Sequence, residues 1–252
     1  MRDDQPISPA GRVKGGILLR FGLMPFVLGA IFFWPAGTFR YWQAWIYMGI
    51  LLIPMSGVLI YFLKRDPAVL ERRLRTKEKE SRQRRVLILG WPSFLGTYLL
   101  PGFDRRFGWS AVPPALVIAA DAVVLTGYLF FFYVLRENRF AGRTVEVDSG
   151  QSVITTGPYA LVRHPMYASV LIQWLFTPLA LGSYWALLPA CLLPVILAAR
   201  IVDEERVLSR ELEGYRDYMG RVKYRLIPGI WKFSALDQGP IDGPPAEEVE
   251  RD

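Results

Sequence analysis

Long apolar blocks are the feature of this sequence that most restricts its fold. Several approach the length of about 20 residues that an α-helix needs to cross the hydrocarbon core of a bilayer. We place them at residues 17–34, 44–63, 86–101, 111–135, 166–181 and 184–201. Backbone polar groups inside a bilayer must be satisfied within the spanning structure, and helices do this. The sequence therefore predicts an all-α fold, a polytopic integral membrane helical bundle with about six spans.

The basic residues predict how the bundle is oriented. Six crossings place both termini and the loops 64–85 and 136–165 on one side of the membrane. Loop 64–85 carries ten basic residues, whereas the loops of the opposite side carry only Arg40, Arg105 and Arg106. Loops rich in lysine and arginine remain in the cytoplasm. We therefore expect a protein of the inner (cytoplasmic) membrane with both termini cytoplasmic.

The distribution of charge also indicates which partners to expect. A net charge of +7 would fit a nucleic-acid-binding protein, but the basic residues lie beside the apolar blocks, where they meet anionic lipid headgroups. One histidine and one cysteine in the chain exclude a zinc site of the common Cys/His kind. We expect membrane lipids as partners, and neither nucleic acid nor metal.

Three regions follow along the chain. Residues 1–135 are the N-terminal transmembrane helices, residues 136–231 contain the last transmembrane hairpin, and residues 232–252 form a tail rich in proline, glycine and acidic residues that we expect to be disordered. Within the second region, residues 144–157 alternate around a turn signal and predict a small β-hairpin.

The last apolar block predicts a helix that leaves the membrane. From Ala198 to Val222 the apolar residues recur at steps of three and four, which is typical of an amphipathic helix. We expect this cytoplasmic helix to continue the final transmembrane hairpin and to end at Gly220 or Pro228.

The segment GPYALVRHPMY, residues 157–167, contains the chain's only histidine at the start of a predicted span. Pro165 suits the first turn of a helix, whose free N–H groups and positive dipole end favour an anion. Arg163 and His164 stand just outside and add donors. The alternative is a basic pair at the membrane surface with Tyr167 as an interfacial anchor.

A second motif, RIVDEE, places Arg200 and Glu204 one helical turn apart. A guanidinium at membrane depth costs about 2.5–3.5 kcal/mol, so Arg200 is a candidate functional residue. The alternative is a local Arg–Glu pair that closes the hairpin. In the third motif, YRDYMGRVKYRLIP, the side chains of Tyr215, Tyr218, Arg221 and Arg225 either roof a pocket at the membrane surface or belong to an interfacial helix.

These motifs, in this order and spacing, resemble the isoprenylcysteine carboxyl methyltransferase family of integral-membrane methyltransferases and its bacterial relatives. The resemblance covers about residues 135–231. It implies an S-adenosylmethionine-dependent methyltransferase that takes its acceptor from the bilayer. One departure is Ser169, which stands where the family usually has glycine.

The resemblance also implies roles for individual residues. It implies that Arg200 binds the acceptor, that Glu204 binds the cofactor, and that these two form the catalytic pair. The other positions implied to contact the cofactor are His164, Pro165, Met166, Tyr167, Ile172, Thr177, Pro178, Leu179 and Ala180. A carboxylate acceptor needs no general base, so His164 is expected to donate a hydrogen bond rather than to take a proton.

The sequence leaves alternatives open for the methyl acceptor and for the class of protein. Carboxyl methylation of an isoprenylcysteine-like thioether is favoured, and a small thiol or an amine headgroup is possible chemistry for the same site. The element RHPMY also fits a nicotinamide-dependent membrane reductase of the sterol-reductase kind, although the EERVL and later tyrosine elements fit a methyltransferase better. A non-catalytic membrane protein is the third alternative.

Overall fold

A computed structural model describes residues 9–74, 81–140 and 150–232. The long helices are α1 (Pro9–Ala36), α2 (Trp42–Arg65), α4 (Ser81–Phe107), α5 (Pro114–Glu137), α6 (Pro165–Ala180) and α8 (Leu193–Glu211). Short elements join or follow them: α3 (Pro67–Leu74), η1 (Gly157–Ala160), α7 (Leu187–Ala190), α9 (Tyr215–Arg221), β1 (Tyr224–Ile227) and β2 (Ile230–Lys232). The fold is mostly helical, as the sequence predicts.

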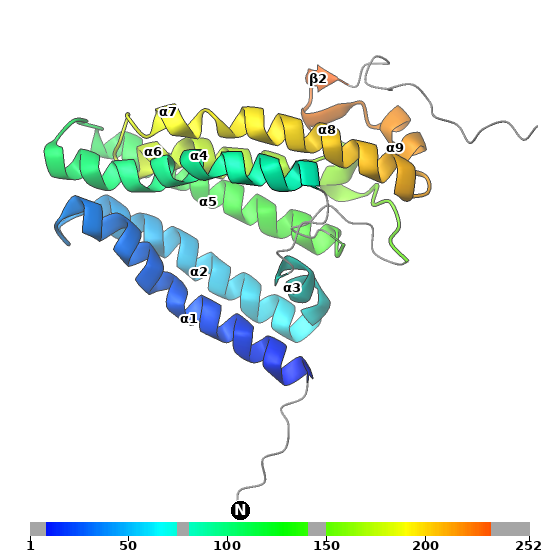
Figure 1. Ribbon diagram of the computed structural model, residues 1–252, viewed down its shortest axis with the longest axis horizontal. Coiled ribbons are helices and arrows are strands. Elements are labelled where there is room, and N and C mark those ends of the chain that lie inside the picture. The colour runs from blue at the N-terminus through cyan, green and yellow to red at the C-terminus, as the bar shows by residue number, and fades with distance from the viewer. Residues whose placement is uncertain (1–8, 75–80, 141–149, 233–252) are drawn as a thin grey trace, which may run out of the picture.

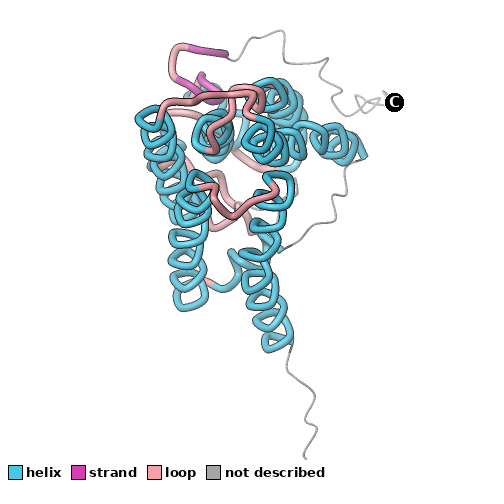
Figure 2. Tube along the Cα trace, turned by 90° about the vertical axis from the view of Figure 1, so that its left-hand side faces the viewer, coloured by secondary structure: helices cyan, strands magenta, loops and turns pink. Residues whose placement is uncertain are grey.

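The long helices lie side by side, and the short C-terminal elements gather at one end of the molecule (Figure 1). Viewed along the long axis, α1 and α2 extend away from the other helices (Figure 2). By length and composition, α2 and α5 are apolar enough to cross a membrane, and Phe21–Ala36 is a shorter apolar helix. The count of six spans stays a prediction.

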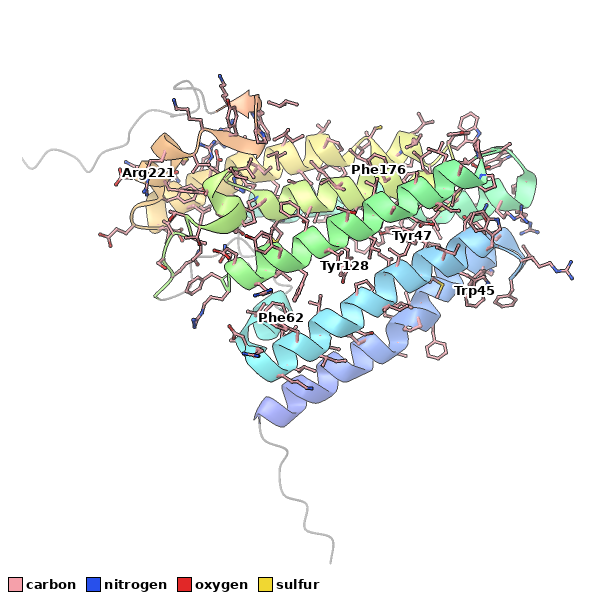
Figure 3. The ribbon with its side chains drawn as sticks, turned by 180° about the vertical axis from the view of Figure 1, so that it is seen from behind. Trp45, Tyr47, Phe62, Tyr128, Phe176 and Arg221 are labelled. Carbon is pink, nitrogen blue, oxygen red and sulfur yellow. The ribbon has the colours of Figure 1, made fainter. Side chains whose placement is uncertain are left out.

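Aromatic side chains mark the end of the bundle opposite α9. Trp45 lies at that end and Arg221 at the other (Figure 3). The helix ends and connections there expose the side chains of Trp34, Phe39, Trp45, Phe107, Trp109, Tyr184 and Trp185. Exposed tryptophan and tyrosine rings are typical of the membrane–water interface. This end therefore has the composition of an interfacial belt.

The C-terminal part of the chain differs from the prediction in two ways. The expected span 184–201 is not one helix, because α7 ends at Ala190 and α8 begins at Leu193, with Pro194 in its first turn. The expected continuous amphipathic helix is also interrupted. It ends at Glu211, and Gly214 adopts a positive φ of 77° before α9 starts. Only glycine takes this backbone conformation readily.

The all-α prediction is wrong at the C-terminal end, where β1 and β2 pair as an antiparallel hairpin. Pro228 and Gly229, whose φ is 86°, form the turn. The hairpin predicted at 144–157 lies partly outside the described residues. No strand occurs in 150–157, the part of it that is described. The predicted tail 232–252 lies outside them except for Lys232.

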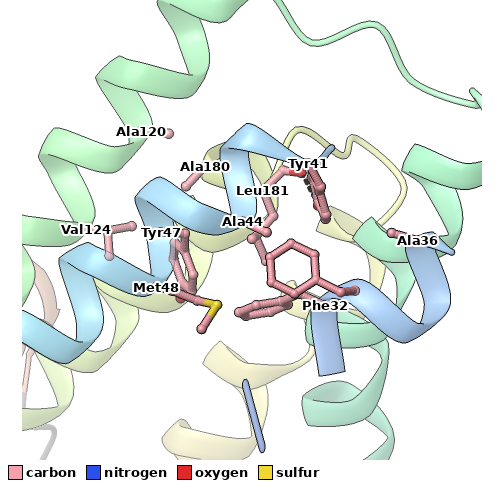
Figure 4. Packing of buried hydrophobic residues seen from close by; sticks show 11 residues of the cluster. Phe32, Ala36, Tyr41, Ala44, Tyr47, Met48, Ala120, Val124, Ala180 and Leu181 are labelled. Atoms are coloured by element: carbon pink, nitrogen blue, oxygen red, sulfur yellow. Dashed lines mark hydrogen bonds between the residues drawn. The ribbon is translucent and has the colours of Figure 1, made fainter. Parts of the chain in front are cut away.

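The largest core cluster joins α1, α2, α5 and α6 (Figure 4). Its fully buried members include Phe32, Tyr41, Ala44, Tyr47 and Val124. The Tyr41 hydroxyl donates to the carbonyl of Leu181 at 2.5 Å, and the Tyr47 hydroxyl lies 2.6 Å from that of Thr177. The two fully buried phenols of this apolar core, Tyr41 and Tyr47, therefore each have a polar partner.

Close packing of α4 on α7 leads to a prediction at Gly96. A Cβ atom there would lie 2.7 Å from Cβ of Pro189, whose ring cannot move aside. Gly96→Ala is therefore expected to lower the free energy of unfolding by about 1–3 kcal/mol. Gly57→Ala is the control, since nothing lies within 4 Å of its Cβ. Thermal unfolding in detergent measures both, and equal midpoints would contradict the packing.

Candidate functional site

The segment before α6 is fixed by the C-terminal hairpin. The N–H of Arg163 donates to the carbonyl of Tyr224 at 3.0 Å, and the N–H of His164 donates to that of Arg225 at 2.9 Å. The Tyr218 hydroxyl of α9 donates to the carbonyl of Tyr159 at 2.7 Å. The start of α6 and the end of the described chain, some sixty residues apart in sequence, therefore form one structural unit.

A buried ionic cluster around Glu205 occupies the centre of this unit. Its Oε1 atom lies 2.8 Å from Nε of Arg163 and 3.1 Å from Nε2 of His164. Its Oε2 atom lies 2.9 Å from Nε of Arg225, whose guanidinium stacks over the ring of Trp231 at 4.8 Å. Glu205 thus connects α8, the start of α6 and β1.

The electrostatics of the cluster keep Glu205 ionised. Burial raises the pKa of the Glu205 carboxyl, but the hydrogen bond from His164 and the charges of Arg163 and Arg225 outweigh it, so the pKa lies below the usual 4.5. The side chains of Arg163, His164, Glu205 and Arg225 are each at most 6% exposed. Within the described structure this cluster is closed and is built to hold elements together.

A second polar group lies beside it, on the adjacent faces of α6 and α8. The Tyr167 hydroxyl donates to Oε2 of Glu204 at 2.5 Å and accepts from Nε of Arg200 at 2.8 Å. Tyr167 and Arg200 are buried, whereas Glu204 is half-buried and reaches the surface. The ring of His164 stacks on that of Tyr167 with centroids 5.7 Å apart. Arg200, Tyr167 and Glu204 therefore form one hydrogen-bonded chain that opens at Glu204.

The motifs thus come together in one site, but the contacts of their residues differ from those expected. Adjacent residues of a helix point in different directions, so Glu204 and Glu205 serve separate groups. Sequence reasoning selected Glu204 and missed Glu205, although both belong to the same EERVL element. His164 contacts Glu205 and Tyr167, and its hydrogen bond goes to the closed cluster.

Two other expected cofactor contacts lie near this end of α6. Pro165 occupies the first turn of the helix, as expected, and is buried. Met166 packs against the cluster of Phe62, Val69 and Leu135. Ser169 keeps its hydroxyl within its own helix by donating to the carbonyl of Met166 at 2.6 Å. The departure from glycine is therefore accommodated locally.

The remaining expected contacts lie further along α6. Ile172 meets Gly127 of α5, where an added Cβ would lie 3.0 Å from its Cγ2. Thr177, Pro178, Leu179 and Ala180 lie at the opposite end of the helix, roughly 15 Å from Tyr167 at 1.5 Å per residue. The structure therefore does not bring residues 177–180 together with Tyr167 and Glu204. Their role in cofactor binding stays a prediction.

The expected roof of the site forms in part. Tyr215 and Tyr218 are buried in a cluster with Leu212, Met219 and Val222, which covers the end of α8. Arg225 belongs to the Glu205 cluster, whereas the side chain of Arg221 is exposed. The two tyrosines thus support the site, and Arg221 lies outside it.

Comparison with known proteins defines the class. Residues 115–213, from the start of α5 to just beyond α8, match the family model described as phospholipid methyltransferase. No curated protein matches the chain. The matched region contains Tyr167, Arg200 and Glu204, and the match indicates a membrane methyltransferase.

The matched family belongs to the isoprenylcysteine carboxyl methyltransferase-like group of integral-membrane methyltransferases, and residues 115–213 of this chain are similar to it. The resemblance drawn from the motifs is confirmed at this level. The match favours a methyltransferase over the reductase and the non-catalytic alternatives. It begins at residue 115 and therefore includes α5, which lies before the expected boundary at residue 135.

Proposed function

We propose that the protein transfers a methyl group from S-adenosylmethionine to a lipophilic or small acceptor at the end of α6 and α8. The observation that carries the proposal is the chain Arg200–Tyr167–Glu204, which places a cation and an anion on opposite sides of one tyrosine hydroxyl. A charged cofactor and a charged acceptor each find a partner of opposite sign there.

These residues fit the cofactor. When bound, S-adenosylmethionine supplies a methyl group on a positively charged sulfur, which departs as a neutral thioether. The half-buried carboxylate of Glu204 favours a cationic ligand, and the Tyr167 ring offers its face to a cation. Because His164 and Tyr167 stack, His164 acts here as a positioning residue that fixes the tyrosine ring.

We assign the acceptor to Arg200. A planar guanidinium has five donors, and Tyr167 takes one of them at Nε. Its fork matches a carboxylate, so the favoured reaction is carboxyl O-methylation, in which a carboxylate oxygen attacks the methyl carbon as the carbon–sulfur bond breaks. No proton has to be removed from a carboxylate, and catalysis rests on positioning and exclusion of water.

The matched family favours a second acceptor, the amine of a phospholipid headgroup. A methyl-transfer assay with labelled S-adenosylmethionine separates the two. Purified protein in detergent is offered lipophilic carboxylates, thiols and aminophospholipids in parallel. We expect label in a carboxylate ester, which base hydrolyses. Label only in the amine headgroup would overturn the carboxyl assignment, and label in none of them would overturn the proposed function.

The site is proposed to face the cytoplasm of the inner membrane, with both termini on that side. The charge asymmetry of the loops supports this orientation. A reporter protein that is active only in the cytoplasm is expected to give a signal when it is fused after Trp231. A fusion to loop 108–113, at the aromatic end, is the control and is expected to give none. The reverse pattern would overturn the orientation.

A further inference from the structure

Two acidic side chains are buried in the part of the bundle remote from Arg200, and they differ in their surroundings. Asp104 of α4 accepts hydrogen bonds from the N–H of Ser110 at 2.7 Å, from the Ser110 hydroxyl at 2.6 Å and from the Ser183 hydroxyl. Asp121 of α5 is 3% exposed, and neither of its carboxylate oxygens has a hydrogen-bond partner. The carboxylate of Asp104 is fully hydrogen-bonded and has a structural role, whereas the burial of Asp121 without a hydrogen-bond partner requires an explanation.

Asp121 lies on the buried stripe of α5, with Val117, Ala120 and Val124. Ala120 and Val124 pack in the core cluster with Tyr47 of α2 and Ala180 of α6 (Figure 4). Asp121 lies three residues before Val124 and therefore on the same face of α5. The carboxylate therefore lies where α2, α5 and α6 meet, away from Tyr167 and Glu204.

The hydroxyl groups at this junction have no proton left for Asp121. The Thr177 hydroxyl donates to the carbonyl of Gln173 at 2.9 Å, so in its 2.6 Å contact Tyr47 is the donor. The donor chain runs from Tyr47 through Thr177 to Gln173, and it leaves only lone pairs on the two hydroxyl oxygens.

Further oxygens lie on the same elements. The amide oxygen of Gln43, one turn before Tyr47, is buried without a hydrogen-bond partner. Pro178 inside α6 has no N–H, so the carbonyl of Trp174 does not receive the usual helical bond. In membranes such released carbonyls occur beside protein cavities or ions, not beside lipid.

We propose that Asp121, together with the oxygens of Tyr47 and Thr177, binds a small monovalent cation such as Na⁺. Carboxylate, hydroxyl and amide oxygens are the ligands that hard cations prefer. One carboxylate carries one negative charge, so a monovalent ion neutralises the site and a divalent ion would leave a buried excess charge. This contrasts with the expectation of no metal, which rested on cysteine and histidine alone.

The test is the thermal unfolding midpoint of the purified full chain in detergent, with NaCl exchanged for choline chloride at constant ionic strength. A ligand that binds the native state raises the midpoint with its concentration. We expect a saturable rise with Na⁺ for the parent protein and no rise for Asp121→Asn. Thr126→Val is the control, because Thr126 is exposed and its hydroxyl donates to the carbonyl of Ala122 on the same helix. It should respond as the parent does.

Tyr47→Phe provides a second variant that keeps the carboxylate and loses one oxygen. We expect it to need about tenfold more Na⁺ for half of the effect. Equal stabilisation of the parent by choline and Na⁺ would overturn the site, as would an unchanged response in Asp121→Asn. If Asp121→Asn does not fold, an unchanged half-saturation in Tyr47→Phe overturns it. None of these readouts depends on methyl transfer.

Discussion

Glu205→Ala is expected to lower the free energy of unfolding by about 3–5 kcal/mol, the cost of leaving buried charges without their partner. Glu205 holds Arg163 and Arg225 at 2.8 and 2.9 Å, and both guanidinium groups are buried. Alanine would leave these two positive charges close together in a closed site. The effect should appear in thermal unfolding of the detergent-solubilised protein.

Glu211→Ala is the matched control, because Glu211 is an exposed acid on the same helix and its loss should change stability by less than about 0.5 kcal/mol. Glu205→Gln keeps the shape of the side chain and tests the charge. The pKa of Glu205 is lowered in the folded state, so its ionisation stabilises the fold above pH 4.5 and the contribution is lost as pH falls below that value. The glutamine variant should lack this acid-sensitive component. Equal stability of the two alanine variants would show that the cluster does not hold the fold.

Arg200→Lys is expected to reduce methyl transfer by one to two orders of magnitude while the affinity for the cofactor stays close to that of the parent. Lysine keeps the positive charge but loses the planar fork, and it cannot hold both the Tyr167 hydroxyl and a carboxylate in the same geometry. A loss of tenfold corresponds to ~1.4 kcal/mol of transition-state stabilisation. The rate is measured with the best acceptor found in the labelled-methyl assay.

The same substitution at Arg210, which is exposed on the same helix, provides the control and should leave the rate unchanged. Normal turnover of Arg200→Lys would reduce Arg200 to a structural partner of Tyr167. If the best acceptor is a thiol or an amine, the carboxylate role of Arg200 fails, although the methyltransferase class stands.

Much of the helical framework could be predicted from sequence because its signal is local. The apolar blocks that became α2 and α5 end within a few residues of the expected limits, since the change from lipid to water falls where apolar residues give way to charges. The prediction of one helix over the last block, residues 184–201, was wrong because a run of apolar residues does not show where the helix is interrupted. Pro189 and Pro194 divide it, and the sequence pattern alone favoured one helix.

Most residues of the candidate site could be predicted from the sequence, but the hydrogen bonds and ion pairs between them could not. Helical spacing placed Arg200 and Glu204 on one face, and the structure adds that the Tyr167 hydroxyl contacts both. The partner of His164 is a tertiary contact across forty-one residues, and no local pattern selects Glu205 over Glu204. Arg225 reached the cluster only because β1 pairs with the segment before α6, in a part of the chain where no strand was predicted.

The central claim is that Tyr167 and Glu204, in their hydrogen-bonded chain with Arg200, bind S-adenosylmethionine. Calorimetric titration of the purified protein with S-adenosylhomocysteine, and separately with NADPH, tests it most directly. We predict saturable binding of S-adenosylhomocysteine, weakened in Glu204→Ala and Tyr167→Phe and unchanged in the exposed control Glu211→Ala, and no binding of NADPH. Binding of NADPH alone, or the same affinity for S-adenosylhomocysteine in all four proteins, would contradict the assignment of the site.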